Sequence, residues 1–306
     1  MTPSEEPPPA KGQAPSRLSV WIQAARPKTL WAAVAPVLVG TALAWRDGAF
    51  HPLAAAAALL GALALQVAAN FANDLYDFER GADTEERTGP LRVTQAGLVS
   101  PSAMRRALIA ALACAFLIGV YLVVRGGWPI VAIGLSSILA TIFYTGGPRP
   151  YGYMGLGEIF VFLFFGVIAV TGTYYVQSLT VTPTAIILSL SMGFLSVAIL
   201  VVNNLRDIDT DRQSGKKTLA VRLGQKGARL ELATMFVCAA LVPALLAGLE
   251  LCGYGVLLAT LAMIGAIPLM RTVCRTNDGP VMNRVLAQTA RLQLIYAVSL
   301  AVGVNL

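Results

Sequence analysis

The sequence has few charged residues and almost no histidine. Charged residues make up 13% of the 306 positions, against roughly 25% in soluble globular domains. His51 is the one histidine, and the four cysteines are isolated, without CxxC spacing, which argues against a zinc site. We interpret the cysteines as free, packed thiols. Hydrophobic residues account for 56% of the chain, which indicates an integral membrane protein.

Long apolar runs recur along most of the chain. Each is close to the ~20 residues that cross a ~30 Å hydrocarbon core as a helix. We therefore predict an all-α membrane protein with nine transmembrane helices. The first run is short and the last carries Arg291 and Gln293 near its start, so eight spans remain an alternative. The predicted spans are 29–45, 53–73, 104–124, 128–145, 156–176, 184–205, 231–249, 253–271 and 286–306.

The first 17 residues differ in composition from the rest. They are rich in proline and polar residues and have too few apolar side chains to order a fold. They also lack the apolar core of a signal peptide. We predict a disordered tail over 1–17 and one polytopic domain over 18–306.

Lysine and arginine fall almost entirely on one side of the predicted bundle. With nine spans and a cytoplasmic N-terminus, 21 of the 23 basic residues lie on the cytoplasmic side, and only Arg46 and Arg125 lie outside. Cytoplasmic loops retain basic residues, so this predicts a C-terminus on the outer side of a bacterial-type inner (cytoplasmic) membrane. The net charge of +7 then reflects a basic face that attracts anionic membrane lipid or an anionic substrate. We expect no nucleic acid partner and no obligate protein partner.

A polar cluster ends the second apolar run, in NFANDLYDFERGADTEERTGP at 70–90. On a helix, Asn70, Asn73, Asp74 and Asp77 lie at i, i+3, i+4 and i+7, which is one face. All four side chains are therefore expected to converge. The alternative is a solvated helix end, although ionisable groups at membrane depth are costly and normally face a polar cavity.

A second cluster ends the sixth run, in VVNNLRDIDTDRQSGKKTLAVRLG at 201–224. Asn203, Asp207 and Asp211 follow at four-residue spacing, whereas Asp209 points away from them. Spans 2 and 6 are four apart, so both clusters emerge on the same side of the membrane. We expect them to face each other across a shared cavity, close to the cytoplasm.

The chemistry of these clusters points to magnesium. Converging carboxylates repel one another unless a cation intervenes. Carboxylate and amide oxygens are the ligands that Mg²⁺ accepts, usually completed by water and substrate phosphates. Arg80, Arg87 and Arg92 follow the first cluster, and Lys216 and Lys217 follow the second, so basic residues would surround a diphosphate. The residues thus predict Mg²⁺ joined to a phosphorylated ligand.

These motifs resemble those of the UbiA-type intramembrane aromatic prenyltransferases. The family pattern reads here as Asn73, Asp74, Asp77 and Asp83, then Asp207 and Asp211. The segments 25–30 (ARPKTL), 72–100, 144–158 (YTGGPRPYGYMGLGE) and 203–224 look most like those of members that prenylate 1,4-dihydroxy-2-naphthoate in menaquinone biosynthesis.

The resemblance implies a fold and a reaction. The fold is a helical bundle around a central cavity open sideways to lipid, with cytoplasmic helix-loop caps after the second and sixth helices. The reaction is Mg²⁺-dependent transfer of a polyprenyl group from polyprenyl diphosphate to 1,4-dihydroxy-2-naphthoate, with loss of CO₂ and diphosphate.

Roles can be assigned to the residues under this resemblance. Tyr144 would shelter the developing carbocation with its ring face, and Asp74 would take a phenolic proton. Asp77 and Asp207 would act in catalysis through the metal. The expected metal ligands are Asn73, Asp77, Asp83, Asn203, Asp207 and Asp211. The expected substrate contacts are Arg26 and Lys28 for the acceptor carboxylate, Arg87, Arg149, Lys216 and Lys217 for the diphosphate, and Asn70 and Glu158.

Other functions remain open at this point. The same fold could prenylate 4-hydroxybenzoate, homogentisate, haem or a chlorophyll precursor. An ion-coupled transporter also carries intramembrane acids, although its sites lie near the membrane midplane rather than at one face. A purely structural membrane protein would leave the two acidic clusters unexplained.

Overall fold

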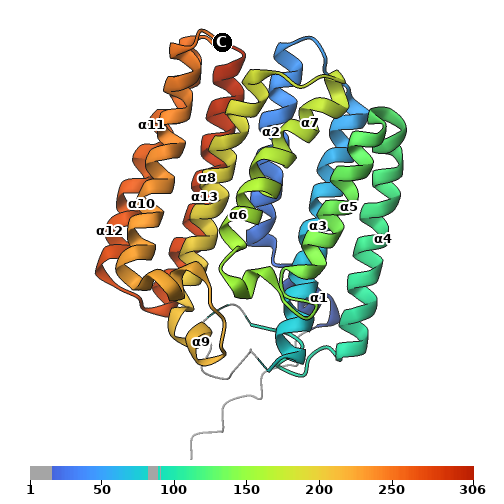
Figure 1. The fold of residues 1–306 in the computed structure, drawn as a ribbon, viewed down its shortest axis with the longest axis vertical. Helices are drawn as coiled ribbons and strands as arrows, with labels where there is room; N and C mark the ends of the chain where they lie inside the picture. Colours follow the sequence, from blue (N-terminus) through green and yellow to red (C-terminus); the bar gives the residue numbers. More distant parts are fainter. Residues whose placement is uncertain (1–15, 82–88, 90) are drawn as a thin grey trace, which may run out of the picture.

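The computed structural model describes residues 16–81, 89 and 91–306, and this part of the chain is helical, without a strand. The all-α prediction is therefore confirmed for it. The long helices lie side by side in a bundle (Figure 1). The elements are α1 (Arg17–Ala25), α2 (Pro27–Arg46), α3 (Pro52–Glu79), α4 (Pro101–Gly126), α5 (Trp128–Phe143), η1 (Tyr151–Met154), α6 (Gly157–Val161), η2 (Phe162–Ile168), α7 (Ala169–Ser178), α8 (Pro183–Arg206), α9 (Ile208–Gln213), α10 (Leu219–Gly248), η3 (Tyr254–Val256), α11 (Leu257–Ala262), η4 (Met263–Gly265), α12 (Ala266–Arg275) and α13 (Gly279–Val304).

Eight helices in the described part are long and apolar enough to cross a membrane. Two of the eight are composite: α6, η2 and α7 run on as Gly157–Ser178, and η3 to α12 run on as Tyr254–Arg275. The ninth predicted span corresponds to α5, which is apolar but has only 16 residues. The chain is thus an integral membrane protein by its helices, and the ninth crossing stays a prediction.

Helix starts follow from short capping signals in the sequence. The side chains of Ser100, Thr182 and Asp278 each accept a hydrogen bond from the backbone N–H three residues on, and proline occupies the first turn of each helix. His51, the one histidine, does the same for α3 through Nδ1. These caps fix where the helices begin, and His51 serves as the N-cap of α3.

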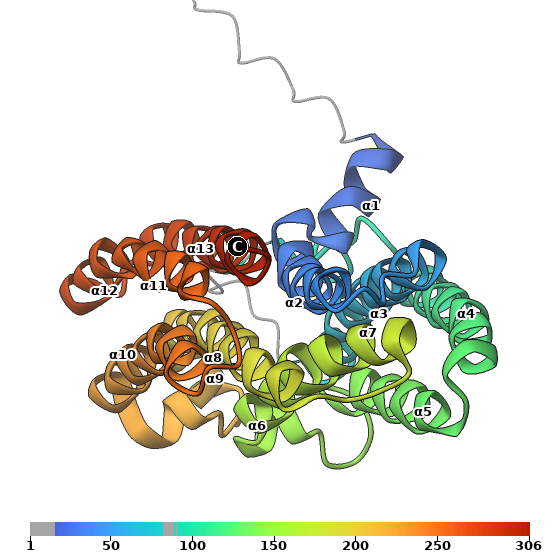
Figure 2. The ribbon, with the colours of Figure 1, turned by 90° about the horizontal axis from the view of Figure 1, so that it is seen from above.

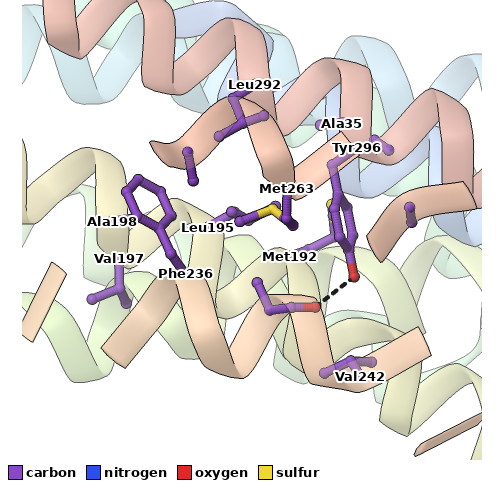
Figure 3. Close-up of a cluster of buried hydrophobic side chains, with 14 of the residues drawn as sticks. Ala35, Met192, Leu195, Val197, Ala198, Phe236, Val242, Met263, Leu292 and Tyr296 are labelled. Atoms are coloured by element: carbon purple, nitrogen blue, oxygen red, sulfur yellow. Dashed lines mark hydrogen bonds between the residues drawn. The ribbon is translucent and has the colours of Figure 1, made fainter. Parts of the chain in front are cut away.

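The bundle has one densely packed half. Helices α8, α10, α11 and α13 meet in a large apolar core, joined there by parts of α2 and α7. Figure 3 shows its centre, where Tyr296 of α13 lies among Met192 and Leu195 of α8 and donates a hydrogen bond to the carbonyl oxygen of Ala239 on α10 at 2.8 Å. This core holds α8, which carries the second acidic cluster, in a fixed position.

The two ends of the bundle differ. Figure 1 places α1 and α9 at one end and the C-terminus at the other. Arg46 and Arg125, the two basic residues predicted on the outer side, lie at the C-terminal ends of α2 and α4, where Arg46 pairs with Asp47 and Arg125 donates to the Gln177 carbonyl. The orientation of the bundle across the membrane stays a prediction.

A π-helical segment, η2, crosses α8 at very short range. A Cβ added to Gly166 of η2 would lie 2.4 Å from the Cα of Gly193 on α8. In the π-helix, Phe164, Phe165 and Ile168 line the central cavity, and such segments are frequent at functional sites. The close crossing therefore fixes one wall of the cavity.

Replacement of Gly166 by alanine should destabilise the protein by ~1–3 kcal/mol, because the added methyl group overlaps the α8 backbone. Gly119→Ala is the matched control, since nothing lies within 4 Å of its Cβ position and alanine favours the helix. The thermal unfolding midpoint in detergent should fall for Gly166→Ala only. Equal unfolding midpoints for the two variants would contradict the close packing of η2 against α8.

Candidate functional site

A cavity of about 670 Å³ occupies the less densely packed half of the bundle. It is lined by α2, α3, α4 and α5, by the composite helix from η2 to α7, and by α8. Figure 2 shows the bundle that contains these helices as seen along its axis. Deep in the bundle its lining is mainly apolar, with Val37, Gly61, Phe116, Ile130 and Val176. Toward α9 the lining becomes polar, with Arg26, Asn70, Asn73, Asp77, Arg92, Asn203, Asp207, Asp211 and Lys216.

Asp77 is the centre of the first acidic cluster. It is 1% exposed, and its Oδ2 accepts a hydrogen bond from Arg92 Nη2 at 2.6 Å. Its Oδ1 accepts from the Tyr153 hydroxyl and from Lys216 Nζ, the latter at 3.3 Å. Two cations from the loops after α3 and α9 therefore neutralise a carboxylate whose charge would otherwise be strongly unfavourable in a buried position.

The second cluster is held by an arginine on its own helix. Arg206 donates from Nε and Nη2 to the two carboxylate oxygens of Asp207, at 2.7 and 2.5 Å. The same Nη2 donates to Asn203 Oδ1 at 2.9 Å. By contrast, Asp209 is exposed and pairs only weakly with Arg212 at 3.5 Å, in agreement with the predicted outward direction.

Lys216 joins the two clusters. Its Nζ lies 3.3 Å from Asp77 Oδ1 and 3.9 Å from Asp211 Oδ1. It also lies 4.7 Å from the centroid of the Tyr153 ring, which is a cation–π distance. Since Asp77 comes from α3 and Asp211 from α9, the two acidic clusters face each other across one cavity, as their spacing predicts.

Two asparagines of α3 link the cavity to neighbouring segments. Asn73 Oδ1 accepts from Thr145 Oγ1 at 3.1 Å. Asn70 Nδ2 donates to the Ala25 carbonyl at 2.8 Å and to Thr29 Oγ1 at 3.1 Å. Asn70 thereby fixes the turn between α1 and α2, where Arg26 has φ 52° and lines the cavity. Left-handed backbone at a non-glycine residue is held in place only by its surroundings, so Asn70 positions Arg26.

Asp74 does not converge with its neighbours, and the predicted four-residue face is wrong in this respect. Its Oδ1 and Oδ2 accept from the backbone N–H groups of Thr94 and Val93, at 3.0 and 3.1 Å. It is 1% exposed and is not among the described residues that line the cavity. Asp74 therefore anchors the loop after α3, and its predicted role as proton acceptor gains no support from its position.

Four other predicted substrate contacts lie away from the cavity lining. The side chains of Lys28, Arg149 and Lys217 are exposed and do not line it. Glu158 is buried behind the wall, where its Oε1 accepts from Asn204 Nδ2 at 3.0 Å. Lys217 contributes through its backbone, whose N–H donates to the Tyr153 carbonyl at 2.9 Å and so orients the loop that carries Lys216. Predicted residues Asp83 and Arg87 lie outside the described residues.

Tyr144 lines the cavity beside a second phenol. The ring of Tyr144, just after α5, meets that of Tyr151 edge-on at 5.3 Å, and Tyr151 stacks on Phe160 at 3.9 Å. Tyr151 donates its hydroxyl to the Ala140 carbonyl at 2.6 Å. Burial raises the pKa of both phenols, and the nearby Glu158 adds to the rise at Tyr144. Both rings therefore remain neutral and offer aromatic faces to the cavity.

The sequence pattern assigns no site role to Thr145 or Arg206, and it does not predict the contact between Tyr153 and Asp77. Arg206 lies one position before Asp207, so the helical period places it off the acidic face. Its long side chain nevertheless folds back onto both Asp207 and Asn203. Tyr153 and Thr145 belong to the segment between α5 and α6, where no helical period relates them to the acids.

The donor atoms of the cavity fit magnesium. Within residues 16–81, 89 and 91–306, no three His, Cys, Asp or Glu side chains form a ready-made metal cluster. The lining instead supplies carboxylates from Asp77, Asp207 and Asp211 and amide groups from Asn73 and Asn203. Mg²⁺ is commonly held by a few carboxylates together with substrate phosphates rather than by an all-protein cage. The set therefore fits a cation shared with a phosphorylated ligand.

Comparison with known proteins gives a consistent picture. The model of the UbiA prenyltransferase family matches residues 33–289. The 1,4-dihydroxy-2-naphthoate octaprenyltransferase of Escherichia coli is 46% identical over 70% of this chain and 71% of its own. That of Mycobacterium leprae is 38% identical over 94% and 96%. A UbiA homologue from Archaeoglobus fulgidus, solved with GPP and Mg²⁺, has a TM-score of 0.63 at 15% identity, covering 92% of this chain and 100% of that one. At that identity it shows the fold alone.

Asp74→Asn should loosen the loop after α3. An asparagine side chain accepts with one oxygen only, so one of the buried amides of Val93 and Thr94 loses its partner at a cost of ~1–3 kcal/mol. Hydrogen–deuterium exchange at these two amides should accelerate. Asp209→Asn, with a side chain 74% exposed, is the control and should leave the exchange unchanged. Loss of activity with unchanged exchange would instead favour a direct chemical role for Asp74.

Proposed function

The chain belongs to the UbiA prenyltransferase family, and we propose that its cavity transfers a polyprenyl group from polyprenyl diphosphate to 1,4-dihydroxy-2-naphthoate. The observation that carries the proposal is that Lys216 contacts both acidic clusters, at the polar end of a cavity whose remaining lining is mainly apolar. A polyprenyl diphosphate has matching chemistry, with an anionic head and a long apolar tail. Relatives at 38–46% identity bear the name of this naphthoate octaprenyltransferase, which supports the acceptor and a place in menaquinone biosynthesis.

The diphosphate group of the prenyl donor would bind between the two acidic clusters. Asn73, Asp77, Asn203, Asp207 and Asp211 would hold Mg²⁺, with Asp83 as a further candidate. Mg²⁺ bound there supplies electrophilic stabilisation of the charge that develops on the leaving diphosphate. The GPP and Mg²⁺ bound to the Archaeoglobus fulgidus homologue support this assignment.

The cations of the cavity would bind the diphosphate directly. Lys216 and Arg92 line the cavity, and each donates an N–H group to Asp77. Charge-assisted hydrogen bonds from such groups to phosphate oxygens are among the stronger ones available to a protein. Arg26 lines the cavity near the α1–α2 turn and is our candidate for the acceptor carboxylate.

The aromatic lining would protect the reacting carbon. Cleavage of an allylic C–O bond leaves a cation that water would quench, so an apolar enclosure favours transfer. The neutral faces of Tyr144 and Tyr151 can stabilise that cation. The helices around the deeper cavity would hold the tail and open sideways to membrane lipid.

The proposed reaction does not require the site to remove a proton from the ring. Attack at the carboxylated carbon forms the new C–C bond, and the carboxylate leaves as CO₂ while its bonding electron pair stays on the ring. No ring proton has to be removed. The position of Asp74 away from the cavity is compatible with such a reaction.

The membrane arrangement is part of the same proposal. α5 would be the ninth span, with residues 18–306 forming one domain in a bacterial-type inner membrane. The N-terminus and the polar end of the cavity would face the cytoplasm, because the basic residues gather there. The segments after α3 and α8 would cap the site. Lys216 and Arg92, which reach Asp77 from these segments, support the capping role.

Purified protein in detergent should convert radiolabelled polyprenyl diphosphate and 1,4-dihydroxy-2-naphthoate to demethylmenaquinol with Mg²⁺ but not with EDTA. Asp77→Asn and Asp207→Asn should lower the rate by about 100-fold or more, because each removes a charged ligand that supports the leaving group. Asp209→Asn should keep wild-type activity, since Asp209 points into solvent.

The acceptor is tested in the same assay. If 4-hydroxybenzoate is prenylated and the naphthoate is not, the metal site stands and the acceptor assignment is wrong. If no aromatic acceptor is prenylated under any metal condition, the proposed reaction is wrong and transport becomes the function to test.

A further inference from the structure

Arg206 is buried directly behind the second acidic cluster. Its side chain is 0% exposed, and that of Asp207 is 6% exposed. Arg206 does not belong to the described lining of the cavity, whereas Asn203 and Asp207 do. Arg206 therefore differs from Arg92 and Lys216, which line the cavity beside Asp77. Its guanidinium acts on the cavity through the two side chains in front of it.

The guanidinium is held from three directions. It donates to both oxygens of Asp207 and to Asn203 Oδ1. On its other side, Nη1 donates to Asn283 Oδ1 at 2.8 Å. Asn283 belongs to α13, which packs against α8 far away in the sequence. The planar fork of an arginine can make these bonds together only in one orientation, so α13 sets the position of the fork.

This arrangement places the ligand groups in front of the guanidinium. The fork of Arg206 contacts both carboxylate oxygens of Asp207, and Asp207 and Asn203 line the cavity whereas Arg206 does not. Residues that hydrogen-bond to metal ligands from behind fix the ligand orientation, and their loss commonly costs 10–100-fold in metal affinity or activity.

We propose that Arg206, anchored by Asn283, is a positioning residue that presents Asp207 and Asn203 to a divalent cation. The inference rests on the proposed function, since it assigns the cation to the same site. It goes further in giving α13 a part in the metal site. Asn283 thus links the packed half of the bundle to the ligands on α8.

The test requires variants that fold. Arg206→Ala would take a bidentate counter-ion away from a buried carboxylate and is a poor choice for this reason. Asn283→Ala removes the anchor of Arg206, Asn283→Asp keeps an acceptor at the same place, and Arg206→Lys keeps the charge without the fork. Asn277→Ala is the matched control: Asn277 Oδ1 accepts from Arg229 Nη2 at 3.1 Å, in an equivalent bond away from the cavity lining.

Binding of Mn²⁺ to the full-length protein should be measured by electron paramagnetic resonance in the presence of inorganic diphosphate, together with the thermal unfolding midpoint. Asn283→Ala and Arg206→Lys should weaken Mn²⁺ binding by ~10-fold or more. Asn283→Asp should recover it to within a few-fold of wild type. Asn277→Ala should bind Mn²⁺ like wild type.

The outcomes separate this inference from the proposed function. Wild-type Mn²⁺ affinity in folded Asn283→Ala and Arg206→Lys would overturn the positioning role and leave the metal site standing. A lower midpoint with unchanged affinity would show that Arg206 and Asn283 only stabilise the fold, which also overturns it. If the wild-type protein binds no Mn²⁺ with diphosphate, both the proposed metal site and this inference are wrong.

Discussion

A carboxylate buried inside a protein has to be neutralised by the groups around it, because the interior offers little water to solvate the charge. Two aspartates meet this requirement in different ways. Asp77 is neutralised by Arg92 and Lys216, which arrive from the segments after α3 and α9. Asp207 is paired with Arg206, the last residue of α8. The first arrangement brings the segments after α3 and α9 to the cavity, and the second also involves α13, because Arg206 donates to Asn283. The polar end of the cavity is thus built by charge compensation.

The unequal packing of the bundle gives this polar end its surroundings. The half around α8, α10 and α13 is filled by a continuous apolar core. The other half encloses the cavity, whose deeper lining from α2 to α5 is mainly apolar. An amphiphilic substrate with a diphosphate head and a hydrocarbon tail suits such a space. Residues that act on the site from behind, such as Arg206 and Asn283, lie where the two halves meet.

Helical periodicity predicted much of the architecture and part of the site. The apolar runs gave the helices, and four-residue spacing brought Asp207 and Asp211 to the cavity. The same rule failed for Asp74, because two backbone N–H groups of a loop compete for its carboxylate. It also failed to predict the contact of Arg206 with Asp207. The long side chain of Arg206 reaches a face of the helix other than the one on which its Cα lies. Tyr153 comes from an irregular segment, where tertiary contacts rather than sequence spacing determine the neighbours.

The most direct test of the central claim is a crystal structure of the full-length protein with Mn²⁺ and a non-cleavable thiolodiphosphate analogue of the prenyl donor, with Mn²⁺ located by anomalous scattering. The account predicts anomalous peaks between Asp77 of α3 and Asp207, which directly follows α8, with the diphosphate near Lys216 and the tail in the apolar part of the cavity. Metal bound away from both aspartates, or a tail that leaves the cavity empty, would contradict it.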